Sequence, residues 1–256
     1  MLAFANRVRT TLPRLDIFIA NAGLEKMEFS LAEGIETTLT VNVMNTMLLN
    51  MAILPKMRGT AKEYGVDTVL TTVGSSVHIF GDVKVLAAPA EIQAGKRDDT
   101  FDRLSDPATA DLGGPDTQMS PRYALSKLML HALLHEFAAR VPLSSSDETA
   151  KECVIMNWVN PGWCASDIGR DKAALPFMNK VFFAILGRTT ECGSRTLVHA
   201  GLSGKESHGK FLSECRVTPE MVWLHSSEGR EVGARLWSEL MRRVWEISPE
   251  VAGFVR

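Results

Sequence analysis

The chain has 256 residues, of which 45% are hydrophobic and 23% are charged, and its formal net charge at pH 7 is −2. This composition is typical of a soluble globular protein, and the length is sufficient for one well-buried domain, which we expect to span 1–256. The nearly balanced charge argues against nucleic acid or an anionic membrane surface as a partner.

The cysteines and histidines indicate neither a disulfide framework nor a metal site. The four cysteines are scattered, with no C-x-x-C pair and no secretory signal, so we expect reduced thiols in a cytoplasmic protein. They are Cys153, Cys164, Cys192 and Cys215. His131 and His135 are four residues apart, but Glu136 is the only acidic or cysteine residue close to them in sequence, so we expect no bound metal.

The N-terminal segment, 1–14, carries three arginines and no acidic residue, which is the composition of a mitochondrial presequence. It also has apolar residues at helical spacing, and we favour an ordinary amphipathic helix that buries them. The apolar runs 43–54 and 177–186 are short and interrupted by polar residues, so we expect no membrane span.

Three short apolar runs, 15–20, 67–73 and 152–159, predict strands that are buried on both faces, as in a parallel α/β sheet. A brief final strand is predicted at 209–212. Small or polar residues follow the first three strands, and ligands in open α/β sheets bind at these carboxyl ends. The three turns are Asn21-Ala22-Gly23, Gly74-Ser75-Ser76 and Asn160-Pro161-Gly162.

Helices are predicted between the strands, at 37–55, 121–140, 189–200 and 231–247. Asn42 lies inside the first helix, where it is either a satisfied core amide or a residue placed for function. Thr190 is expected to cap the third helix. The alternation of strands and helices favours an α/β fold with a doubly wound parallel sheet of the Rossmann type.

Two further segments are predicted to cover a substrate site. The stretch 78–119 is polar and irregular, and a connection of this length inside a compact domain is usually a lid or binding loop, or else disordered. The segment 171–186 has the pattern of a short amphipathic lid.

Tyr123 and Lys127 are four residues apart in the helix that begins after Ser120 and Pro121, so they project from one face. A cation beside a phenol favours the phenolate, so we expect the pKa of Tyr123 to fall toward neutral pH. The phenol would then act as a general acid or base. A surface tyrosine and lysine that share a helix face by accident is the alternative.

Several of these motifs occur in one order along nearly the whole chain. They are Asn21-Ala22-Gly23, Asn42, Ser75, Tyr123 with Lys127, and Pro161-Gly162. In this order they resemble the short-chain dehydrogenase/reductases, and the surrounding residues resemble the fungal members of that family.

The resemblance implies a role for each catalytic residue. Tyr123 would exchange the proton at the substrate oxygen, and Ser75 would donate a hydrogen bond to that oxygen. Lys127 would lower the pKa of Tyr123 and hold the nicotinamide ribose, and Asn42 would anchor a water that relays protons to Lys127. Ser75 is chosen over Ser76 because Gly81 then follows six residues later, as in the family pattern S-x-x-G-x-x-G, although His78 replaces the first glycine. Ser76 is the alternative.

The resemblance also implies a nicotinamide cofactor, which we expect to be NADP(H), with NAD(H) as the alternative. The residues implied to bind it, besides Tyr123 and Lys127, are Asn21, Ala22 and Gly23 on the adenosine side, and Pro161, Gly162, Cys164 and Ser166 on the nicotinamide side. The sequence has no counterpart of the family's N-terminal T-G-x-x-x-G-x-G turn, which seats the cofactor's diphosphate. We therefore expect an N-terminally truncated sheet in which 15–20 forms an exposed edge.

The resulting functional prediction is an oxidoreductase that interconverts a secondary alcohol and a ketone on a small hydrophobic substrate, in fungal secondary metabolism. The alternative is a truncated scaffold without redox activity, such as a cofactor-free isomerase or cyclase or an inactive remnant. Pairing of two chains through the Tyr123 helix is expected only by analogy with the family.

Overall fold

The computed structural model describes residues 1–26, 28–87, 99–109, 121–143, 153–164, 168 and 187–255. The predicted lid 171–186, the cap residue Ser120 and the site residue Ser166 lie outside these ranges.

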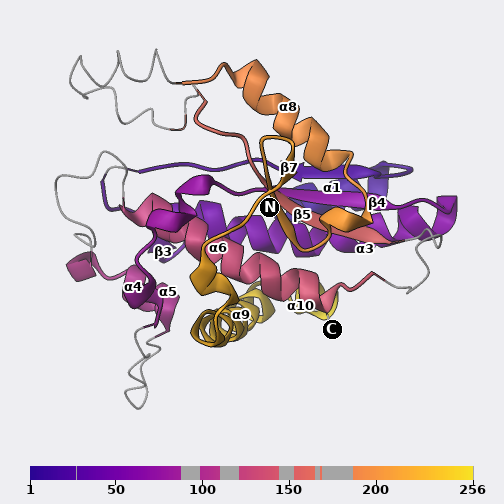
Figure 1. The fold of residues 1–256 in the computed structure, drawn as a ribbon. Coiled ribbons are helices and arrows are strands. Elements are labelled where there is room, and N and C mark those ends of the chain that lie inside the picture. The colour runs from indigo at the N-terminus through magenta and orange to yellow at the C-terminus, as the bar shows by residue number, and fades with distance from the viewer. Residues whose placement is uncertain are drawn as a thin grey trace.

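A five-stranded sheet of order β1-β4-β5-β6-β7 forms the centre of the fold (Figure 1). Its strands are β1 (Ile17–Ala20), β4 (Thr68–Val73), β5 (Val154–Asn160), β6 (Lys210–Ser213) and β7 (Arg216–Val217). The first four are parallel and β7 is antiparallel to β6. The predicted strands and the mostly parallel sheet are confirmed, whereas β7 was not predicted.

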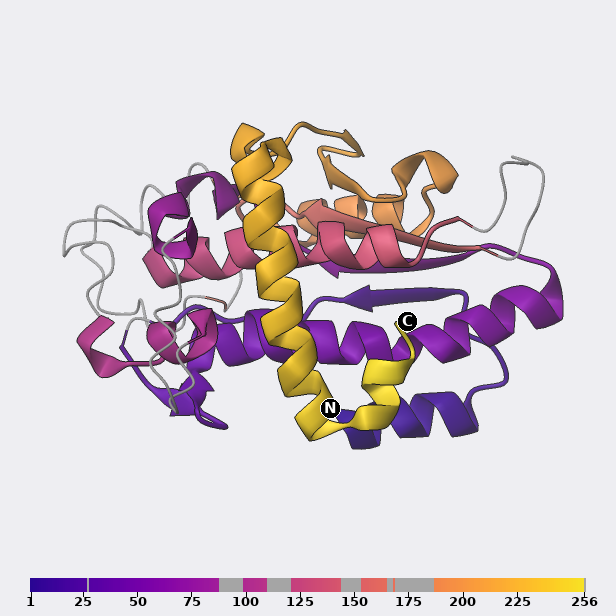
Figure 2. The same cartoon turned by 90° about the horizontal axis from the view of Figure 1, so that it is seen from below.

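Helices cover both faces of this sheet (Figures 1 and 2). One face carries α8 (Thr190–Gly201), and the other carries α3 (Thr46–Tyr64) and α6 (Pro121–Arg140). On their outer side, α9 (Ser227–Ile247) packs on α6, and α1 (Leu2–Thr11) packs on α3. The remaining C-terminal helix, α10 (Pro249–Gly253), brings Glu250 to an ion pair with Arg9 at 2.8 Å, so the two ends of the chain lie together.

The two central strands are almost wholly buried, whereas β1 lies at the edge of the sheet. In β1 the burial increases along the strand, from Ile17, which is 40% exposed, to the buried Ala20. An exposed apolar edge at this strand is what the sequence predicts.

The long apolar helix extends beyond its predicted end. After α2 (Thr37–Leu39) and a π-helical turn, η1 (Thr40–Asn45), the chain continues as α3 through Pro55 to Tyr64, where Gly65 ends it with a φ of +59°. The predicted end at Pro55 is therefore wrong. By length and composition Thr37–Tyr64 resembles a membrane-spanning helix, but 83% of its most apolar stretch is buried inside the protein, as in a core helix.

The stretch 78–119 is more ordered than predicted where the structure describes it. It contains η2 (Ser76–Phe80), α4 (Val83–Ala87), α5 (Thr100–Leu104) and η3 (Pro107–Thr109). Leu86, Phe101 and Leu104 are fully buried in the main core, and Arg243 of α9 forms ion pairs with Asp99 and Asp102 at 2.6 and 2.8 Å. Sequence periodicity missed α4 and α5 because each is only 5 residues long, too short to show a helical repeat of apolar residues.

Other differences lie at element ends and in short elements. Thr189, not Thr190, caps α8, because its hydroxyl accepts a hydrogen bond from the Cys192 amide. Helix α9 begins four residues earlier than expected, at Ser227, after the 3-10 turns η5 (Lys205–Ser207) and η6 (Val222–His225). The small hairpin of β2 (Leu31–Ala32) and β3 (Ile35–Glu36) was also not predicted. The four cysteines are free, as expected.

A matched pair of phenylalanines tests whether α5 belongs to the core. Phe101 is fully buried, and Arg243 lies over its ring at 5.2 Å, whereas Phe80 of η2 is 69% exposed. We expect Phe101→Ala to lower the free energy of unfolding by about 3–5 kcal/mol. Phe80→Ala should change it by less than about 0.5 kcal/mol. Urea denaturation of both variants measures this, and equal effects would contradict a core role for α5.

Candidate active site

The predicted catalytic side chains meet at the carboxyl end of β4. Tyr123 and Lys127 come from the first turns of α6, and Ser75 follows β4 directly. Tyr123 and Ser75 are each 9% exposed, and the Ser75 side chain lies close enough to the phenol to lower its pKa. Lys127 Nζ donates to the Val73 carbonyl at 2.9 Å and lies 5.7 Å from the centre of the Tyr123 ring. The alternative interpretation, that Tyr123 and Lys127 are surface residues that share a helix face by accident, is therefore wrong, because both side chains are buried.

Ser75, rather than Ser76, faces the phenol. Ser75 Oγ accepts a hydrogen bond from the Val77 amide at 3.3 Å and so caps η2. Ser76 is exposed, and its amide donates to Asn160 Oδ1 at 3.2 Å. The geometry favours Ser75 as the hydroxyl that would contact a substrate oxygen beside Tyr123.

Asn42 connects the turn after β1 to α6. It lies in the π-helical turn η1, where its Oδ1 accepts from the Leu24 amide and its Nδ2 donates to the Leu24 carbonyl, both at 2.9 Å. Nδ2 also donates to Ser126 Oγ at 3.1 Å. Both readings of Asn42 from the sequence are compatible with this arrangement, because the amide is buried and satisfied yet lies beside the site.

The pKa values differ from the sequence-based expectation. Burial, and then the charge of Glu25, raise the pKa of Tyr123 to about 12, although the Ser75 side chain lowers it in part. Burial lowers the pKa of Lys127 to about 8. The prediction of a lowered tyrosine pKa is therefore wrong for this structure, because desolvation of the phenolate outweighs the nearby cation. Tyr123 holds its proton at neutral pH.

The predicted cofactor residues lie at the ends of the neighbouring strands. Asn21 and Ala22 are exposed after β1, and a Cβ on Gly23 would lie 3.3 Å from Asn42 Oδ1, so the backbone passes close to the site. A cofactor that lies across the carboxyl ends of the strands would contact this open turn.

The residues after β5 divide between that edge and helix α8. Pro161 is partly exposed, and Gly162 has a φ of +80°, which favours glycine. Cys164 donates its S–H to the Pro161 carbonyl at 3.4 Å and packs against Gly193 of α8. Close packing by Gly193 therefore orients the thiol toward α8.

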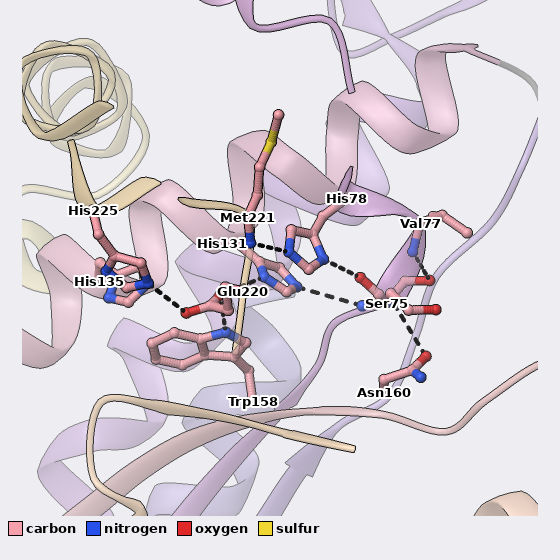
Figure 3. Close-up of polar contacts among 11 residues, drawn as sticks. Ser75, Val77, His78, His131, His135, Trp158, Asn160, Glu220, Met221 and His225 are labelled. Atoms are coloured by element: carbon pink, nitrogen blue, oxygen red, sulfur yellow. Dashed lines mark hydrogen bonds and ion pairs between the residues drawn. The ribbon is translucent and has the colours of Figure 1, made fainter. Parts of the chain in front are cut away.

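Two histidines to which the sequence analysis gave no role at this site, His78 and His131, hold the backbone of Ser75 (Figure 3). His131 Nε2 accepts from the Ser75 amide at 3.4 Å, and His78 Nδ1 donates to the Ser75 carbonyl at 2.8 Å. The two rings stack with their centres 4.2 Å apart. Burial lowers the pKa of both histidines, that of His131 to about 4, so both rings are neutral at pH 7.

The histidine pair is fixed in turn by the segment before η6. His78 Nε2 accepts from the Met221 amide at 3.1 Å, and His131 Nδ1 donates to Glu220 Oε1 at 2.7 Å. Burial alone would raise the pKa of Glu220, but the bonds from His131 and His135 outweigh it and hold that pKa well below its usual range. The spacing of His131 and His135 was the available signal, but their acidic partner follows about 85 residues later and was out of reach of sequence reasoning.

A glycine substitution tests how tightly His131 fits the turn after β4. A Cβ on Gly74 would lie 2.5 Å from His131 Nε2, so Gly74→Ala forces a shift of the ring or of the Ser75 backbone. We expect a loss of about 1–3 kcal/mol in the free energy of unfolding. Gly59 in α3 is the control, because a Cβ there meets nothing within 4 Å and Gly59→Ala should be neutral or stabilising. Chemical denaturation compares the two, and a neutral Gly74→Ala would contradict the close fit.

The lowered pKa of Lys127 predicts a pH-dependent stability. Between its pKa in the fold, about 8, and the ordinary value of 10.5, the unfolded chain binds more protons at this group. Wild type should therefore gain stability relative to Lys127→Met as the pH rises through this window, and lose it as the pH falls. The gain should reach about 3 kcal/mol, as measured by urea denaturation at a series of pH values. A difference that stays constant across the window would contradict the lowered pKa.

Comparisons with known proteins identify the family. No protein-family model matches the chain. The short chain dehydrogenase/reductase dmxR8 of Cryptosporiopsis sp. is 39% identical over 97% of this chain and 70% of its own length. The short-chain dehydrogenase anuD of Penicillium roqueforti is 31% identical over 97% of this chain, which covers 61% of that relative.

Among solved structures, the RhlG/NADP complex of Pseudomonas aeruginosa has the same fold, with a TM-score of 0.52 and 20% identity over 83% of this chain and 70% of that one. The fungal relatives are too similar over too much of the chain to share only a fold. The protein therefore belongs to the short-chain dehydrogenase/reductase family of oxidoreductases.

Proposed function

We propose that the protein interconverts a secondary alcohol and a ketone with NADP(H), and that Tyr123 exchanges the proton on the substrate oxygen. The observation that carries this proposal is the burial of the Tyr123 phenol beside Ser75, with Lys127 fixed next to them at the carboxyl end of β4. This arrangement supports a proton donor and a second hydroxyl that act on one substrate oxygen.

The residues act in sequence at that oxygen. Ser75 Oγ donates a hydrogen bond that orients the ketone, and Tyr123, protonated at neutral pH, donates its proton as the alkoxide forms. In the reverse direction the phenolate accepts the alcohol proton, and Lys127, when charged, stabilises that phenolate. The nicotinamide, when bound, supplies or accepts the hydride.

The proposed cofactor site follows the strand ends. Asn21, Ala22 and Gly23 would hold the adenosine side, Lys127 would bind the ribose, and Pro161 and Gly162 would contact the nicotinamide. The assignment of Cys164 and Ser166 to the same site remains part of this proposal. Support for NADP comes from RhlG, which was solved as a complex with NADP and shares the fold.

A hydrophobic substrate is supported by the surface around this edge of the sheet. Ile79 and Phe80 follow Ser75 on η2, and Trp163 and Ile168 follow β5, and all four side chains are exposed. Exposed large apolar side chains that follow the ends of two neighbouring strands would favour an apolar ligand there. We propose a small hydrophobic alcohol or ketone of fungal secondary metabolism, in the cytoplasm.

The first test is binding of NADPH and NADH to the 256-residue chain, followed by nicotinamide fluorescence. We expect micromolar binding of NADPH. A chain that is folded by circular dichroism but binds neither nucleotide up to about millimolar concentration would instead favour the scaffold without redox activity.

Once turnover of a ketone is found, Tyr123→Phe should lower kcat by about 10²- to 10⁴-fold while cofactor binding is retained. The matched control is Tyr64→Phe, because Tyr64 is the other tyrosine of the chain, is half exposed and packs on Arg14. Retained turnover in the Tyr123 variant would exclude this phenol as the proton donor.

A further inference from the structure

Glu220 is a carboxylate buried among histidines, away from Tyr123 and Lys127. It lies between β7 and η6 and its side chain is 4% exposed. Three other elements supply its neighbours: α6 with His131 and His135, β5 with Trp158, and η6 with His225 (Figure 3). A buried carboxylate needs a hydrogen-bond donor or a cation at each of its two oxygens. The two oxygens of Glu220, Oε1 and Oε2, have different partners.

Oxygen Oε1 is fully occupied by protein donors. Trp158 Nε1 donates to it at 2.9 Å. His131 Nε2 accepts from the Ser75 amide, so the proton of this neutral ring is on Nδ1, which donates to Oε1 at 2.7 Å. These two bonds fix the plane of the carboxylate and leave Oε2 to the two histidines that reach the surface.

Oxygen Oε2 points at two more imidazoles that reach the surface. His135 Nε2 lies 2.7 Å from it and His225 Nε2 lies 3.9 Å from it, and the side chains are 28% and 57% exposed. The three ligand atoms lie within 4.8 Å of one another. The rings of His135 and His225 meet edge to face with their centres 5.2 Å apart.

We propose that His135, Glu220 and His225 bind a zinc ion through Nε2, Oε2 and Nε2. Two imidazoles and one carboxylate are a ligand set that zinc takes in proteins, with bonds of about 2.0–2.2 Å and water at a fourth position. His135 would carry its proton on Nδ1, and the metal would replace the proton that now lies between Nε2 and Oε2. The exposed His225 ring moves toward Oε2 to complete the set.

The surrounding contacts prepare this site. The bonds from Trp158 and His131 to Oε1 are the kind of outer contacts that orient a ligating carboxylate. The other group of potential ligands, His78, His131 and Glu220, is less suitable. Both of its histidines are buried, and all four of their ring nitrogens have protein partners: the Ser75 carbonyl, the Met221 amide, the Ser75 amide and Glu220.

Zinc at this position would connect parts of the fold that surround the catalytic turn. It would join α6 to η6. Glu220 accepts a hydrogen bond from His131, and His131 in turn accepts one from the Ser75 amide. The metal would therefore stabilise the segment that fixes Ser75 without contacting substrate. This proposal does not depend on the redox activity.

The test is zinc binding by the complete chain without a polyhistidine tag, measured by competition with a chromophoric chelator. We expect one zinc ion per chain and a rise in the thermal midpoint on adding ZnCl₂. His225→Gln and His135→Gln should each weaken binding by about tenfold or more. In the His135 variant the glutamine amide can still donate to Oε2, and His225 is mostly exposed, so both variants should fold.

The controls exclude other ligands. His199→Gln replaces a histidine of α8 outside the cluster and should bind zinc like wild type. Cys192 and Cys215 are exposed thiols, so the double variant Cys192→Ser, Cys215→Ser should also retain the site. Unchanged affinity in both histidine variants, loss of binding in the serine variant, or no binding up to about millimolar zinc would each overturn the proposal.

Discussion

The junction between α6 and the carboxyl end of β4 determines the arrangement of the whole site. Lys127 Nζ donates to the Val73 carbonyl, and one helical turn further on His131 Nε2 accepts from the Ser75 amide. These two bonds satisfy backbone groups that the strand leaves unpaired where it ends. They also fix Tyr123 opposite Ser75, so the geometry of the proposed proton transfer follows from how one helix packs on one strand.

Burial is the second constraint, and it sets the protonation states. Desolvation raises the pKa of Tyr123 and lowers those of Lys127 and His131, which keeps all three groups closer to neutral. Glu220 is the exception, since donors from three side chains hold it as a carboxylate. The same network orients Oε2, the oxygen on which the proposed zinc site depends, so a metal there would act on Ser75 only through the protein.

The edge strand β1 precedes one of the turns proposed to bind the cofactor. Its outer side is partly exposed, and the turn that follows it, Asn21-Ala22-Gly23, is open. The chain spans 61% to 70% of the two fungal relatives, which belong to the same family. Cofactor affinity is therefore the property in which this chain and those relatives can be compared most directly.

The sequence by itself determined the four parallel strands and the main helices, because apolar periodicity and turn residues are local signals. The grouping of Ser75, Asn42, Tyr123 and Lys127 came from the resemblance to the family and not from these local signals. Tertiary structure alone decided the sign of the tyrosine pKa shift, since burial is not encoded at a spacing of four residues. It also decided the partner of His131, because Glu220 follows it by 89 residues in the chain and meets it only in the fold. Tertiary structure also decided the short core elements such as α5. Their few apolar residues do not show in the sequence that they are buried, because burial depends on what they contact in the fold.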